Sequence, residues 1–154
     1  DVEEPRSEDF ETLSVKFGLP YLLVQDTLKP EHLPKYEFTE EEGHFLMMRN
    51  YDIECGPDAT TIQDLTRKIA LFITDSRLIT IHRVHLNYID KVAERCQKTE
   101  FPRTLPGLVH MLTLEVIRSY EDPIDRLQDM HDEFETDVLS KNCQLKTERI
   151  YHFR

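Results

Sequence analysis

The stretch of residues 67–83 constrains the fold of this chain most strongly. It contains two runs rich in β-branched and aromatic residues, joined at Asp75-Ser76, and this pattern predicts a pair of strands. Residues 69–73 of the first run are almost wholly apolar, which is typical of a strand that is covered on both faces. We therefore expect a central sheet with other elements packed on each side.

Helical patterns flank these strands on the N-terminal side. Ser7 is expected to cap a helix that Gly18 ends, because serine accepts hydrogen bonds at helix starts and glycine tolerates the left-handed conformation at helix ends. Pro20 is expected to begin a second short helix, which Pro30 ends. Residues 44–54 then alternate as a strand does.

The C-terminal half returns to a helical period. Residues 86–97, residues 105–120 and the segment after Pro123 each place apolar side chains on one face. Whether Pro123 breaks or only kinks the last helix stays open at this point. The layout predicts an α/β fold with one mixed or antiparallel sheet and long C-terminal acidic helices.

The charge balance narrows the classes of partner. The chain has 154 residues, which favours one domain, and its 30 acidic and 19 basic residues give a net charge of −11. Such a field repels phosphate groups, so nucleic acid is not an expected partner, whereas cations are attracted.

Catalytic and membrane-spanning patterns do not stand out. Cys55, Cys96 and Cys143 are widely spaced without a CxxC pair, which indicates free thiols in a reducing compartment. No nucleophile signature surrounds Cys96, so we do not expect an enzyme. The longest apolar run, residues 19–24, is far shorter than the ~20 residues of a membrane helix.

Two groups of residues could bind metal. His82 and His85 are paired histidines, but zinc needs a third ligand, so the pattern favours ordinary surface histidines. Residues 121–137 hold eight acids and one base, and Asp125, Asp129 and Asp132 share one helical face. Such a face is normally a solvated surface, but repulsion between its carboxylates would also be relieved by cations.

Four stretches, in this order, resemble the CorA-type divalent-cation transporters. They are "DFETLSVKFGLPYLLVQDTL", "LPKYE", "IALFITDSRLITIHR" and "LVHMLTLEVIRSYEDPIDRLQDMHDEFETDVL", and the likeness runs over about residues 9–142. The family implies an α/β/α sandwich in a homopentamer, followed by a stalk helix and two membrane helices. By this resemblance residues 1–142 are an N-terminally incomplete cytoplasmic domain, residues 143–154 begin the stalk, and the transmembrane region is absent.

The resemblance also implies a function and its residues. It predicts a soluble regulatory domain on the cytoplasmic side of the inner membrane, which senses Mg²⁺, or Co²⁺ or Zn²⁺, and is coupled to the pore. Asp26 falls where the family holds a regulatory cation between subunits, although Gln25 replaces the glutamate before it. Glu115, beside Leu114, and Asp132 on the acidic helix complete the predicted metal ligands. The alternative is a stand-alone acidic protein-interaction module.

Overall fold

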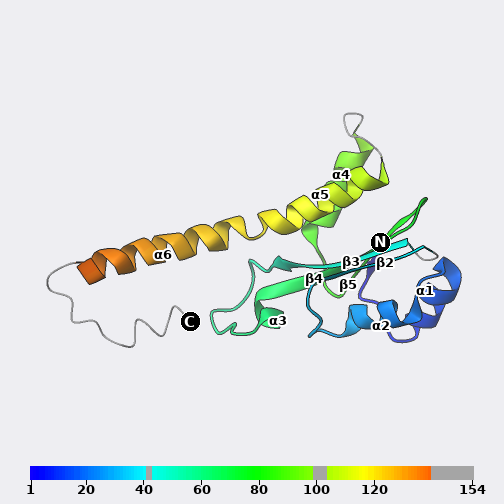
Figure 1. The fold of residues 1–154 in the computed structure, drawn as a ribbon, viewed down its shortest axis with the longest axis horizontal. Coiled ribbons are helices and arrows are strands. Elements are labelled where there is room, and N and C mark those ends of the chain that lie inside the picture. Colours follow the sequence, from blue (N-terminus) through cyan, green and yellow to red (C-terminus); the bar gives the residue numbers. More distant parts are fainter. Residues whose placement is uncertain (41–42, 99–103, 140–154) are drawn as a thin grey trace. The chain divides into compact units, whose positions relative to one another are not determined.

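The structure is a computed structural model that describes residues 1–40, 43–98 and 104–139 (Figure 1). Its elements, in chain order, are β1 (Val2–Glu3), α1 (Asp9–Phe17), α2 (Tyr21–Leu28), β2 (Lys35–Thr39), β3 (Gly43–Tyr51), α3 (Ile62–Leu65), β4 (Thr66–Ile73), β5 (Leu78–His82), α4 (Asn87–Gln97), α5 (Leu105–Arg118) and α6 (Glu121–Leu139). They fall into two compact units that divide between Ser119 and Tyr120, and α6 belongs to the second unit. The predicted stalk segment, residues 143–154, and the predicted domain end at residue 142 lie outside the described residues.

One five-stranded sheet organises the first unit. Its strand order is β1-β5-β4-β3-β2. The short β1 runs parallel to β5, and every other neighbouring pair in the sheet is antiparallel. The prediction of a mixed, largely antiparallel sheet is confirmed, and the hairpin predicted over residues 67–83 is the β4–β5 pair.

Helices cover both faces of this sheet, as the apolar run in residues 69–73 predicted. Because successive side chains of a strand point to opposite faces, Ala70 and Phe72 of β4 enter a core with α1 and α2. Ile69 and Leu71 enter a second core with α4 and α5. All four side chains are buried. The first unit is therefore an α/β/α sandwich, as expected.

The N-terminal helices begin and end for local reasons. Gly18 ends α1 in the left-handed conformation, with φ of 67°, and the N–H of Leu19 donates to the carbonyl of Ser14 at 3.1 Å. The expected cap at Ser7 is wrong, because the cap position is Glu8. The Asp9 carboxylate instead accepts from the backbone N–H of Arg6 at 2.7 Å, and this bond closes the turn before the helix.

The C-terminal helices have a clear boundary. α5 ends at Arg118 and α6 starts at Glu121, so Pro123 lies in the first turn of α6. Proline is tolerated there because the first N–H groups of a helix have no partner inside it. Pro123 therefore neither breaks nor kinks a longer helix. Within the described ranges, none of the helices is both long enough and apolar enough to cross a bilayer.

Candidate functional site

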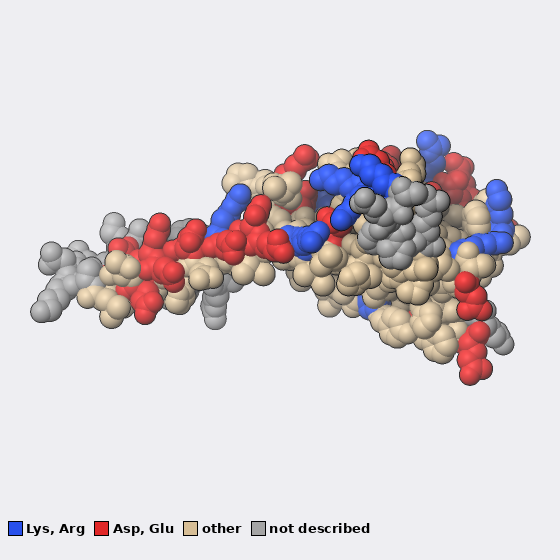
Figure 2. All heavy atoms as spheres, turned by 90° about the horizontal axis from the view of Figure 1, so that it is seen from above, with Lys and Arg blue, Asp and Glu red and all other residues tan. Residues whose placement is uncertain are grey.

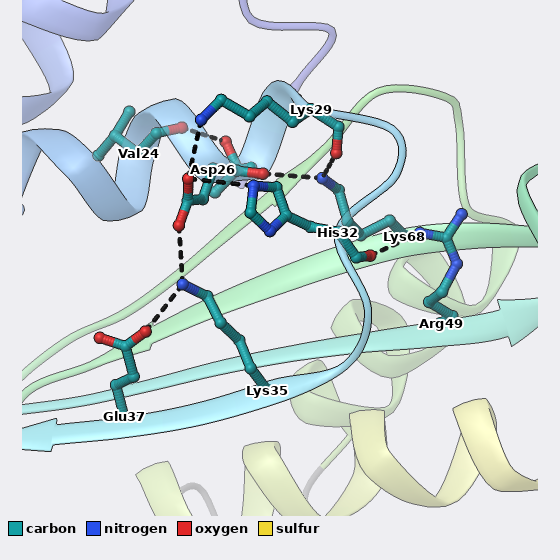
Figure 3. A network of polar contacts seen from close by, with 9 residues as sticks. Val24, Asp26, Lys29, His32, Lys35, Glu37, Arg49 and Lys68 are labelled. Atoms are coloured by element: carbon teal, nitrogen blue, oxygen red, sulfur yellow. Dashed lines mark hydrogen bonds and ion pairs between the residues drawn. The ribbon is translucent and has the colours of Figure 1, made fainter.

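Asp26 lies near the C-terminal end of α2, on the side of the helix that faces β2 (Figure 3). Its neighbours on the helix fix the orientation. Val24 is fully buried in the core, and the Thr27 hydroxyl donates to the Val24 carbonyl at 2.6 Å. With those two side chains turned inward, the carboxylate of Asp26 lies at the border between core and solvent, where 19% of its side chain is exposed.

Three basic side chains surround this carboxylate. Oδ2 of Asp26 accepts from Nζ of Lys35 at 2.7 Å. Oδ1 lies 3.2 Å from Nε2 of His32 and 3.5 Å from Nζ of Lys29. Lys35 belongs to β2, whereas Lys29 and His32 come from the turn between α2 and that strand (Figure 3). Both oxygens of Asp26 are therefore already paired within the chain.

The charges of this cluster stabilise each other. Partial burial alone would raise the pKa of Asp26, but the hydrogen bond and charge of Lys35, with the charge of His32, outweigh burial and lower it. Burial likewise opposes protonation of Lys35, yet its bonds to Asp26 and Glu37 raise the pKa of Lys35 above its ordinary value. Both shifts favour the charged form of the group, so the pair is ionised at neutral pH.

A second layer of basic groups holds the backbone beneath the cluster. Nζ of Lys68, on β4, donates to the carbonyl oxygens of Asp26 at 2.9 Å and of Lys29 at 2.5 Å. Arg49, on β3, donates to the carbonyls of Pro30 and His32, each at 3.0 Å. These contacts satisfy carbonyls that the end of α2 and the following turn leave without helical partners.

The surroundings of Lys68 disfavour its protonated form. Burial, with the nearby charges of Arg49 and Arg83, lowers the pKa of Lys68 to about 8. A cation approaching Asp26 would therefore meet positive charge on several sides and would have to displace Lys35, His32 or Lys29. Within one chain Asp26 serves as the acceptor of an ion-pair cluster, and its predicted role as a metal ligand stays a prediction.

Glu115 lies on the opposite face of the sheet. It belongs to α5, and its Oε1 lies 3.2 Å from Nη1 of Arg118 and 3.6 Å from Nη1 of Arg95 on α4. Since α2 and α5 pack against different faces of the sheet, Asp26 and Glu115 do not converge within one chain. Glu115 joins α4 to α5 through Arg95.

Asp132, the third predicted ligand, belongs to the acidic helix α6. Figure 2 shows carboxylates gathered along this helix. The side chain of Asp132 is 67% exposed. Ligand atoms of His131, Asp132 and Glu135 all lie within 4.8 Å of one another. Of the three predicted ligands, Asp132 alone is open to an incoming cation without first losing a lysine or arginine partner that the structure describes.

The same helix exposes an apolar stripe. No side chain of α6 is buried within the described residues. Exposed apolar side chains recur at helical spacing at Ile124, Leu127, Met130 and Val138, and Leu139 is exposed at the end of the helix. An amphipathic helix usually buries such a stripe against another element.

A further group of potential ligands was missed by the sequence pattern. Asp1, Glu3 and His82 place ligand atoms within 4.8 Å of one another at the β1–β5 edge of the sheet. The expectation of an ordinary surface histidine is wrong for His82, which is buried, and holds for His85, which is exposed. The sequence pattern named His82 but missed Asp1 and Glu3, because these two residues are distant from His82 in sequence.

Comparisons with known proteins agree on one family. The family described as "CorA-like Mg2+ transporter protein" matches residues 1–154. The cobalt/magnesium transport protein CorA of Methanocaldococcus jannaschii is 24% identical over 158 residues, which cover 100% of this chain and 47% of that protein. The chain thus spans less than half the length of this relative.

Solved structures share the fold. The soluble domain of the same M. jannaschii CorA matches with a TM-score of 0.60 and 24% identity, over 97% of this chain and 58% of that one. Full-length CmaX matches with 0.71 and 16% identity, over 92% and 42%. The ZntB cytoplasmic domain of Vibrio parahaemolyticus matches with 0.65 and 15% identity, over 82% and 50%. With the family match over its whole length, this chain belongs to the CorA-like Mg²⁺ transporter proteins.

Proposed function

We propose that this chain is the cytoplasmic regulatory domain of a divalent-cation transporter, on the inner-membrane side that faces the cytoplasm. It senses Mg²⁺, and Co²⁺ and Zn²⁺ are the alternative cations. Binding of the cation changes the state of the domain, and this change regulates a pore formed by another part of the protein. One observation supports this function most directly: in a member of this family, a 19-residue helix carries closely spaced, exposed carboxylates.

The physical basis is repulsion between like charges. Along α6, Asp125, Asp129 and Glu133 follow each other at four-residue spacing, and Asp132 adds a further carboxylate one turn from Asp129. Each such pair costs a helix about 0.2–0.5 kcal/mol. Mg²⁺ prefers carboxylate oxygens and keeps several of its waters, so it would relieve this repulsion without a closed protein cage.

Sensing requires that the cation favour one state of the assembly over another. We propose that the exposed apolar stripe of α6 packs against other helices of the assembled protein, which is a homo-oligomer and, by the family resemblance, a pentamer. Binding of a cation at Asp132 would then change how readily these helices approach each other. The coupling free energies of such systems are typically about 1–3 kcal/mol.

Asp26 and Glu115 enter this proposal in a different way. Each is already paired with basic side chains of its own chain. They would act as ligands only at a contact between copies, where their basic partners exchange for a cation. Variants of Asp132 and of Asp26 therefore separate a direct site on α6 from a site that depends on exchange.

The test uses the full-length protein in liposomes that contain a Mg²⁺-sensitive dye. We expect Mg²⁺ influx that falls as Mg²⁺ rises on the side that holds this domain. In D129N/D132N, half-inhibition should require about tenfold more Mg²⁺, which lies within the usual range of allosteric coupling. D26N should leave the midpoint unchanged if, in the wild-type protein, Asp26 stays paired with its lysines and therefore binds no cation.

The matched control is E8Q/E11Q, which removes two exposed charges from the start of the first unit. An equal shift in this control would contradict a site on α6 and indicate a general effect of net charge. Absence of divalent-cation flux in any preparation of folded protein would contradict transport itself. It would favour the alternative of an acidic interaction module.

A further inference from the structure

The β1–β5 edge of the sheet brings two carboxylates to a buried histidine. Val2 pairs with Ile81 and Glu3 pairs with His82 in parallel register. The N–H of Glu4 donates to the carbonyl of His82 at 2.8 Å, which fixes the register. Because residues two apart along an extended chain share a face, Asp1 and Glu3 both present their carboxylates on the side of His82.

The hydrogen bond at Nδ1 determines the tautomer of His82. Nδ1 lies 2.7 Å from the carbonyl oxygen of Val84. A carbonyl oxygen can only accept, so Nδ1 must carry a hydrogen. Neutral histidine carries one ring hydrogen, so its Nε2 is then a lone-pair acceptor. Metal-binding histidines are commonly oriented in this way, by donation of the other ring N–H to a backbone carbonyl.

That lone pair faces the oxygens of Asp1. Nε2 of His82 lies 3.0 Å from Oδ1 and 3.2 Å from Oδ2 of Asp1. A lone pair and a carboxylate repel unless a proton or a cation lies between them. The side chain is only 1% exposed, which leaves a buried nitrogen aimed at carboxylate oxygens.

Other side chains hold the two carboxylates in place. The Thr80 hydroxyl donates to Oδ1 of Asp1. Nδ1 of His85 lies 3.1 Å from Oε2 of Glu3, and Nε2 of the same ring lies 3.1 Å from Oδ2 of Asp90. The cluster therefore has its own supporting contacts, which is what a built site requires and a random group of surface acids lacks.

We propose that Asp1, Glu3 and His82 form a binding site for a divalent transition-metal ion of the Zn²⁺ class. One imidazole nitrogen and two carboxylate oxygens suit Zn²⁺ and Co²⁺ better than Mg²⁺, which prefers oxygen alone. At Zn–N and Zn–O distances near 2.0–2.2 Å, tetrahedral ligand atoms lie roughly 3.3 Å apart. The ligand atoms already lie within 4.8 Å of one another, so side-chain movements would bring them to these distances, and water would complete the coordination.

This site is separate from the carboxylates of α6 and does not depend on the proposed function. It lies in the first unit, at the sheet edge, and the relevant experiment measures binding by the 154-residue chain without a membrane. The α-amino group of Asp1 is a competing ligand, so the chain is used in N-terminally acetylated form. His131 is changed to Asn throughout, to remove the histidine of the second potential metal group.

The experiment titrates Zn²⁺, Co²⁺ and Mg²⁺ by calorimetry and follows the ring signals of His82 by NMR. We expect one Zn²⁺ per chain, an affinity at least about 100-fold above that for Mg²⁺, and a Zn²⁺-dependent shift of the His82 Nε2 signal. D1N and E3Q each remove a ligand, so each should weaken Zn²⁺ binding by at least about 10–100-fold, the cost of losing even an outer-shell partner of a ligand. The matched control is E11Q, which removes an exposed charge from α1.

The outcomes are distinguishable. E3Q changes a half-exposed side chain, so its fold can be verified directly, whereas H82Q alters the core and would be ambiguous alone. If Zn²⁺ leaves the His82 signal unchanged at millimolar concentration, the bridge is a proton and the proposal is wrong. The same conclusion follows if E11Q weakens binding as much as E3Q does, or if Mg²⁺ binds as tightly as Zn²⁺.

Discussion

At the scale of single residues, Asp26 connects α2 to β2 through Lys35. The contact is short and partly buried, and it lies beside the ring of Phe45, with Nζ of Lys35 5.3 Å from the ring centroid. A charged hydrogen bond in such a place contributes more than an exposed surface pair does. This contact therefore helps to fix the end of α2 against the sheet.

We predict that D26N lowers the free energy of unfolding by about 1–2 kcal/mol at pH 7, because it removes a charge-assisted bond. The pKa of Asp26 is lowered in the folded chain, so its contribution is present above the unfolded pKa near 3.9 and disappears as pH falls through the folded pKa. Urea denaturation between pH 2.5 and 7 should show the variant and the wild type converging in acid.

E37Q is the control for this variant, since Glu37 is the more exposed partner of Lys35. It should cost clearly less than D26N at pH 7. Equal losses from the two substitutions would show that the Asp26 contact has no special place in the cluster.

Lys68 should give stability an unusual dependence on alkaline pH. Its folded pKa is about 8, whereas an unfolded lysine titrates near 10.4. Between these values the unfolded chain binds more protons, so the free energy of unfolding rises with pH. We predict a gain of about 1–3 kcal/mol between pH 7.5 and 10, from a shift of this size.

K68M should abolish that rise, and denaturation of both proteins over this pH range measures it. Lys35 acts in the opposite direction, because its pKa is raised, but its contribution is lost only above pH 10.4. K91M, which removes a lysine with an exposed side chain on α4, provides the control and should keep the alkaline gain.

The basic partners of Asp26 illustrate what sequence can and cannot predict at this scale. Lys29, His32 and Lys35 follow Asp26 at three-residue intervals, which is a visible signal. Their convergence depends on how the turn with Pro30 and Pro34 folds back, and Arg49 and Lys68 hold that turn from distant strands. Periodicity gives no information about such contacts.

At the scale of elements, Gly43 decides how β3 begins. Its φ is 82°, and a Cβ at this position would lie 2.4 Å from the carbonyl oxygen of Ile73. Backbone from β4 thus occupies the place of a side chain. We predict that G43A lowers the free energy of unfolding by about 1–3 kcal/mol, the usual cost of such strain. The matched control is G56A, where the added carbon meets nothing within 4 Å.

Urea denaturation of both variants checks this prediction. The structural reason would be contradicted if G43A and G56A lost the same amount, because only Gly43 combines a left-handed conformation with a close backbone neighbour. Hydrogen exchange should further place the damage at the β3–β4 pair near Ile73.

Elements with a strong period were predictable, and the shortest elements were not. The β4–β5 hairpin follows from alternation and apolar content, and so does its burial on both faces. β1 has two residues and α3 has four, too few for any period to show. α3 does carry a local signal, a capping box in which Thr61 and Asp64 exchange hydrogen bonds.

At the scale of the whole molecule, the sequence predicted the class of architecture and the family but not the pairing of distant groups. Asp1 meets His82 across 81 positions of sequence. That contact exists because β1 adds to the sheet edge in parallel beside β5. A two-residue strand carries no pattern that could place it there, so the approach of Asp1 and Glu3 to His82 becomes visible only in three dimensions.

The apolar stripe on α6 has a consequence for handling the chain in solution. In dilute buffer the net charge of −11 keeps copies apart, but the Debye length shortens from about 10 Å at 0.1 M salt to about 3 Å at 1 M. We predict salt-induced self-association, measured by sedimentation velocity, and its loss in L127S/M130S. The control V15S changes an exposed apolar residue of α1 and should leave association unchanged.

If V15S suppressed association equally, nonspecific hydrophobic association rather than the α6 stripe would be responsible. The practical result concerns colloidal behaviour: any assay that adds magnesium chloride also screens the electrostatic barrier between particles. Clouding or oligomer formation in such an assay can therefore imitate ligand recognition, unless sodium chloride of equal ionic strength is run alongside.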